Sequence, residues 1–178
     1  MAAATGEAIV GELTGTRLTF LPAQIVSLVD FAAAHPEGDV LSRETGFDRD
    51  YGRNPYVGYD AVDENPFLFD GVLDGRLPPK ERVVTVGERD NAVAFPYSEL
   101  RKVGVASATV DGRRLTFVRE GGVAAPIRDR ETGSTWSVTS IATDGELAGT
   151  RLEPVIHGDH FWFAWAAFSP KTTIRTAG

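Results

Sequence analysis

An eight-residue segment occurs twice in this chain and constrains its fold more than any other feature. Residues 11–18 read GELTGTRL and residues 145–152 read GELAGTRL, so seven of the eight positions are identical at a spacing of 134 residues. The correspondence continues downstream, where Phe31 aligns with Trp165. This spacing is too long for the period of a solenoid, so the sequence predicts two pseudo-equivalent halves rather than an array of repeats.

The two predicted copies cover residues 5–41 and 114–175, and we expect them to pack as a single domain over residues 1–178. Strand-like sequence precedes the second octapeptide, and the counterpart of Trp136 in the first copy is Ala2. We therefore expect the domain to be truncated at its N-terminus, within the first copy. The alternative, a first copy that is naturally shorter, would leave unpaired strands at an open sheet edge.

The hydrophobic pattern predicts a mainly β (α+β) fold of antiparallel strands and hairpins with a few short helices. Asp111-Gly112, between two alternating segments, is the clearest hairpin signal. Pro22 is expected to begin a helix with one apolar stripe, which His35 and Pro36 end. The predicted strands are 7–13, 17–21, 40–41, 83–87, 91–95, 105–110 and 114–118, the predicted helices are 22–34 and 96–103, and 42–80 is an ordered loop region.

The composition excludes several classes of partner. The chain has 18 Lys and Arg against 25 Asp and Glu, a formal net charge of −7, and an acidic surface repels phosphate backbones and anionic headgroups. We therefore expect no nucleic-acid partner. No apolar run is long enough to span a bilayer, so no membrane-spanning segment is expected. The chain has no cysteine, which excludes disulfides, thiolate metal sites and cysteine nucleophiles.

Six sequence blocks cover nearly the whole chain: GELTGTRL, LSRETG, RNPYVGYD, NPFLFDG, RLPPKERV and HGDHFWFAWAAFSP. With these blocks in this order, the chain resembles domain-of-unknown-function family 3179 (DUF 3179), a family of bacterial and archaeal proteins without an established activity. Many members are exported or lipid-anchored, so the resemblance implies an extracytoplasmic location, periplasmic or at the cell surface, for the full-length protein. It also implies an upstream segment with a Cys-Pro-Leu-Cys-like motif, which this chain does not contain.

His157-Gly-Asp-His160 is the strongest candidate for a functional site. Imidazole nitrogens are ligands for copper, zinc or iron, and Asp159 could be a third ligand or orient an imidazole. At the spacing of 134 residues the two histidine positions hold Ala23 and Val26, so the shared fold does not require histidine there. We therefore predict a transition-metal site at His157, His160 and Asp159. In the structural alternative, Asp159 caps the next helix and a histidine bonds a backbone carbonyl.

Residues 161–168, FWFAWAAF, contain two of the three tryptophans. A helix that is apolar on all sides is normally buried, so we expect core packing rather than a cofactor site. If the N-terminal part of the first copy is missing, some of this helix would be exposed. We then expect either homo-oligomerisation or the missing N-terminal segment to cover it.

No catalytic template is found in the sequence, neither a G-x-S-x-G elbow, nor a phosphate-binding loop, nor an H-E-x-x-H motif. No catalytic residue is therefore predicted. The expected function is a binding or accessory domain with a transition-metal site. One alternative is a metal-dependent or redox enzyme whose remaining ligands lie in the missing N-terminal segment, and another is an interaction module that uses the Trp-rich helix.

Overall fold

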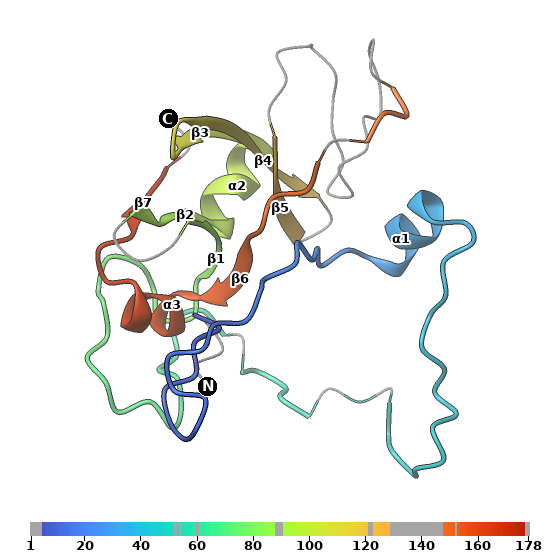
Figure 1. The fold of residues 1–178 in the computed structure, drawn as a ribbon, viewed down its shortest axis with the longest axis horizontal. Helices are drawn as coiled ribbons and strands as arrows, with labels where there is room; N and C mark the ends of the chain where they lie inside the picture. Colours follow the sequence, from blue (N-terminus) through green and yellow to red (C-terminus); the bar gives the residue numbers. More distant parts are fainter. Residues whose placement is uncertain are drawn as a thin grey trace.

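Two sheets and three short helices make up the regular part of the fold (Figure 1). The computed structural model describes residues 5–51, 53, 55–59, 61–87, 91–120, 123–128, 148–151 and 153–176. Within them, the helices are α1 Leu28–Ala34, α2 Tyr97–Val103 and α3 Trp162–Phe168, and the strands are β1 Arg82–Val86, β2 Val93–Pro96, β3 Val105–Val110, β4 Arg113–Glu120, β5 Val123–Arg128, β6 Gly158–Phe161 and β7 Thr173–Ile174. The predicted mainly β, α+β fold is confirmed.

The first sheet has the strand order β6-β1-β2-β7. β1 is rich in valine and threonine, which favour the pleated backbone, and it pairs with β2 in the predicted antiparallel hairpin, with Val84 opposite Phe95. β6 pairs with the free edge of β1, and β7 runs parallel to β2. Both outer strands therefore come from the C-terminal part of the chain.

The second sheet has the order β3-β4-β5, with antiparallel neighbours. Asp111 (φ 49°) and Gly112 (φ 73°) join β3 to β4, and a two-residue turn with positive φ at both positions matches the right-handed twist of its strands. α2 begins after Pro96 and ends at Gly104, whose φ of 73° suits glycine. The hairpin and helix predicted for this stretch are confirmed.

The core consists of two clusters on opposite sides of the β1–β2 hairpin, because successive strand residues face opposite sides of a sheet. Val84 and Phe95 face α2 and the second sheet, where Phe95 meets Phe117 at a ring-centroid distance of 4.2 Å. The opposite face packs against α3. That second cluster contains Val83, Ala92, Ala94, Trp162, Trp165 and Ala166.

The N-terminal region departs from the prediction. The strands expected at 7–13 and 17–21 are reduced to one bridge between Glu7 and Arg17, closed by hydrogen bonds such as Ala8 N–H to the Thr16 carbonyl. No strand forms at 40–41, where Leu41 is 98% exposed. Although Ala8 is buried, most of the large apolar side chains in these stretches are exposed, and an apolar pattern alone does not stabilise a strand.

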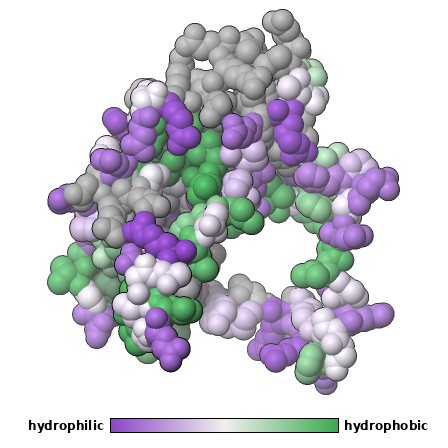
Figure 2. Space-filling model, viewed as in Figure 1, coloured by the Kyte–Doolittle hydropathy of each residue, from purple (hydrophilic) through white to green (hydrophobic). Residues whose placement is uncertain are grey.

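The helix predicted from Pro22 begins only at Leu28. Ser27 is its N-cap, since its hydroxyl accepts a hydrogen bond from the Asp30 amide at 3.1 Å, and a capped start leaves the preceding residues outside the helix. None of the residues of α1 is buried. Figure 1 shows α1 apart from both sheets, and Figure 2 shows open space between this arm and the body.

α1 and α3 nevertheless begin and end at positions that differ by 134 residues, the spacing of the two octapeptides. The residues that end the helices, His35 and Ser169, have nearly the same backbone angles (φ −136°, ψ 72° and φ −134°, ψ 64°). Gly15 and Gly149 also occupy equivalent positions and both have positive φ. Residues 145–147 and 152 of the second octapeptide lie outside the described part, so the pseudo-repeat and the single-domain organisation stay predictions.

Candidate functional site

A pocket of about 450 Å³ lies between the N-terminal loop, the end of β1 and residues 153–160. His157 and His160 both line it. The remaining lining comes from the N-terminal loop, the end of β1, the β3–β4 turn, residues 153–158 and α3, namely Thr5, Arg17, Phe20, Thr85, Val86, Gly87, Asp111, Arg113, Glu153, Pro154, Val155, Ile156, Gly158, Trp165 and Ser169. The structure therefore brings the two predicted imidazoles to one cavity.

His157 has a buried nitrogen without a hydrogen-bond partner. Its Nδ1 lies 2.7 Å from the Val155 carbonyl oxygen, and because a carbonyl only accepts, Nδ1 carries the proton of the neutral ring. Nε2 then holds a lone pair, and it is the single buried side-chain polar atom left unpaired among the described residues. Imidazoles that bind metals commonly donate their other N–H to a backbone carbonyl in this way.

His160 stacks on Trp165 with ring centroids 4.9 Å apart and an interplanar angle of 18°. Its Nε2 folds back over Gly158, where an added Cβ atom would lie 2.0 Å away, so this ring position requires glycine at 158. Burial lowers the pKa of His160, and the negative charge of Asp159 opposes that shift. His160 is therefore held in its neutral, electron-donating form.

Asp159 lies on the other side of β6 from His160. In the β1–β6 pairing His160 is opposite Val83 and Asp159 is opposite Val84, so the two side chains face different core clusters. The Asp159 carboxylate is 6% exposed, accepts a hydrogen bond from the Tyr97 hydroxyl and lies 3.7 Å from the Arg82 guanidinium. The structure thus separates Asp159 from the two histidines, and the described residues contain no group of three or more metal-binding side chains.

Asp159 does not cap α3 either. The N-cap of α3 is Phe161, and the first amides of the helix are bound by the main chain before β1: Trp162 N–H donates to the Glu81 carbonyl and Phe163 N–H to the Pro79 carbonyl, both at 2.8 Å. The expected core role of the Trp-rich helix is confirmed for one face. Trp162, Trp165 and Ala166 are buried, whereas Phe168 is 48% exposed.

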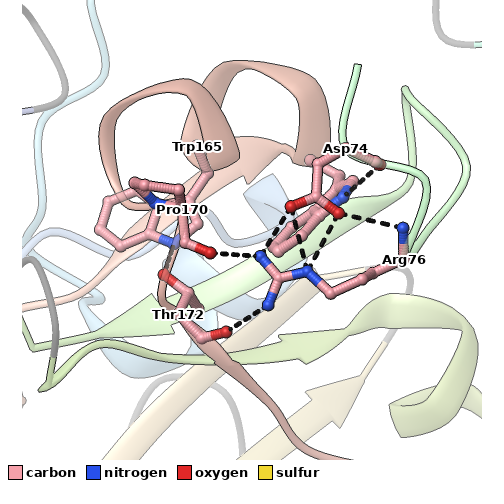
Figure 3. A network of polar contacts seen from close by, with 6 residues as sticks. Asp74, Arg76, Trp165, Pro170 and Thr172 are labelled. Carbon is pink, nitrogen blue, oxygen red and sulfur yellow. Dashed lines mark hydrogen bonds and ion pairs between the residues drawn. The ribbon is translucent and has the colours of Figure 1, made fainter. Parts of the chain in front are cut away.

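Arg76 connects this helix to the loop before β1 (Figure 3). Its guanidinium donates to the Asp74 carboxylate and to the carbonyls of Pro170 and Thr172, and it lies 5.0 Å from the centre of the Trp162 ring. The hydrogen bond from Arg76 holds the pKa of Asp74 below its ordinary value, with burial acting in the opposite direction. We call this set of contacts the Arg76 network.

Residue spacing indicated the histidines but not the rest of the pocket. Arg17 and Phe20 reach it from a segment that lies more than 130 residues earlier in the chain, and Arg113 reaches it from the β3–β4 turn. No local motif links these positions. Arg17 belongs to the repeated octapeptide, but that repetition does not indicate a pocket.

Comparison with known proteins identifies the family. No curated protein and no solved structure matches the chain. No helix in the described part of the chain has the length and apolar character needed to cross a membrane. Residues 2–172 match the family described as Protein of unknown function (DUF3179). Because the match covers nearly all of its length, the chain belongs to the DUF3179 family.

Proposed function

We propose that this chain is a binding domain whose pocket holds a transition-metal ion, copper, zinc or iron, at His157 and His160. One observation carries the proposal: the buried Nε2 atom of His157 has a lone pair and no partner, in a residue that lines the pocket. A buried acceptor left unpaired costs about 1–3 kcal/mol, and an ion that accepts its lone pair removes that cost.

His160 supports the same site. It lines the same pocket, burial keeps its imidazole neutral, and Gly158 leaves the space that its ring occupies. Imidazole nitrogen suits zinc, copper and iron. Asp159 is not part of the proposed ligand set, because its carboxylate is engaged by Tyr97 and Arg82 on the other face of β6.

Two protein ligands leave positions on a metal ion open to the pocket. Such a site can bind an external ligand in the pocket, and we propose an accessory binding role for it. Nothing in the described part of the chain favours the alternative of a metal-dependent or redox enzyme. The extracytoplasmic location is likewise a proposal, supported by the family resemblance. A longer reading frame with an export signal would support it.

Metal content tests the site. The wild-type chain, incubated with Zn²⁺ or Cu²⁺ and desalted, should retain about one ion per chain, and the double variant His157→Ala/His160→Ala should retain none. His35→Ala is the matched control, because His35 is the third histidine of the chain and does not line the pocket. Gly158→Ala should weaken retention by displacing His160. Equal metal content in all four proteins would contradict the proposal.

A further inference from the structure

The pocket is larger than a metal site needs. A cavity of about 450 Å³ falls within the range of small-molecule sites. Its walls include the apolar side chains of Phe20, Val86, Val155 and Trp165. These surfaces favour a ligand with an apolar body of its own.

The charged side chains that line the pocket include equal numbers of positive and negative groups. Arg17 and Arg113 contribute two positive charges, and Asp111 and Glu153 contribute two negative charges. Asp111 and Arg113 flank Gly112 at the tip of the β3–β4 hairpin, and within the described part of the chain their side chains form no hydrogen bond or ion pair. Arg17, in contrast, pairs with Glu7 at 3.2 Å.

We infer that the pocket binds a small zwitterion, an amino acid with an apolar side chain. The Arg113 guanidinium matches a carboxylate, the Asp111 carboxylate matches an ammonium group, and the apolar walls receive the side chain. Asp111 and Glu153 would repel a doubly charged anion, and Arg17 and Arg113 would repel a simple cation. The inference rests on the proposed binding role of this pocket but does not require the metal.

Three related ligands test the inference on the full chain after removal of metal with a chelator. L-leucine carries both charges, leucine amide lacks the carboxylate, and N-acetylleucine lacks the ammonium group. Calorimetric titration should show that leucine binds and that each derivative binds at least tenfold more weakly, a loss of about 1.4 kcal/mol or more. Absence of leucine binding at millimolar concentration, or equal binding of the three compounds, would overturn the inference.

Two variants test which residue binds the carboxylate of the ligand and which binds its ammonium group. Asp111→Asn keeps the turn, because Asn-Gly also favours positive φ at both positions, and it should weaken leucine and leucine amide but not N-acetylleucine. Arg113→Gln should weaken leucine and N-acetylleucine but not the amide. Arg101→Gln, on the exposed face of α2 and outside the pocket, is the matched control and should bind all three like the wild type. Uniform effects on all three ligands in both variants would contradict the assignment.

The two proposals fail separately. Loss of metal retention in the wild type with leucine binding intact would refute the metal site alone. Metal retention by the histidines without selective leucine binding would refute the zwitterion alone.

Discussion

α1 and α3 occupy equivalent places in two stretches of sequence 134 residues apart, yet only α3 is buried. After α1 the His35 amide donates to the Phe31 carbonyl, and after α3 the Ser169 amide donates to the Trp165 carbonyl. α1 starts at a serine cap, whereas the first amides of α3 are bound by the carbonyls of Pro79 and Glu81. The two helices therefore end in the same way, and they differ in that α3 packs on the first sheet while no residue of α1 is buried.

The largest expected difference between the two helices concerns Trp162 and its counterpart Leu28. Trp162 is 0% exposed and packs on the β1–β2 hairpin, whereas Leu28 is 64% exposed. Trp162→Ala should lower the free energy of unfolding by about 3–5 kcal/mol through cavity formation. Leu28→Ala should change it by less than about 0.5 kcal/mol. Urea unfolding followed by far-UV circular dichroism measures both, and similar losses would show that α1 is buried in solution.

The second prediction concerns the Arg76 network, which attaches the segment after α3. Arg76→Ala should lower the free energy of unfolding by about 1–2 kcal/mol, because it removes charge-assisted hydrogen bonds that are partly exposed to solvent. Arg101→Ala, an exposed arginine of α2, should have no measurable effect. A loss of similar size in both variants would contradict the role assigned to Arg76.

The loss of stability caused by Arg76→Ala should depend on pH. The lowered pKa of Asp74 means that its ion pair stabilises the fold at pH values above the ordinary carboxyl pKa, near pH 4. This stability is lost as the pH falls through the lower pKa of the folded state. The difference in unfolding free energy between wild type and Arg76→Ala should therefore shrink on acidification from pH 6 to pH 3. A difference that stays constant over this range would show that the stabilising effect of Arg76 does not depend on the ionisation of Asp74.

The smallest expected effect comes from Ser27→Ala. The Ser27 hydroxyl caps α1, so its removal should loosen that helix while leaving global stability unchanged within about 0.5 kcal/mol. Hydrogen exchange should accelerate at the amides of Phe31 and His35, which form hydrogen bonds at the start and at the end of α1. Exchange at Ser169, the equivalent position after α3, should not change. Slower or unchanged exchange in α1 would contradict the assigned cap.

The sequence predicted elements whose signals are local. Asp111-Gly112 demands positive φ at both positions, and Gly104 ends α2 in a conformation that suits glycine, so the elements around them were correctly predicted. The continuous apolar stretches that form β1 and β2 were also correctly predicted as strands, and their pattern fits a hairpin buried on both faces. The apolar pattern before residue 42 was misleading, because most of its large apolar side chains, among them Val10, Leu13 and Leu21, are exposed.

The candidate site was predicted only in part. His157 and His160 were identified from their types and spacing, and both line the pocket. Asp159 was grouped with them because a carboxylate between two histidines could be a third ligand or orient an imidazole. The segment is a strand paired with β1, and the alternation of a strand sends Asp159 to Tyr97. Arg17 and Arg113 could not be found, because only the tertiary fold brings them to the pocket.

The strand order of the first sheet has a consequence for folding. β1 meets β6 through pairs such as Arg82 with Phe161, and β2 meets β7 through pairs such as Ala94 with Ile174. Both edges of the hairpin are therefore closed by strands about 80 residues further along the chain. Because contacts of such sequence separation form slowly, both edges of the hairpin stay open to other strands until late in folding, when β6 and β7 pair with them.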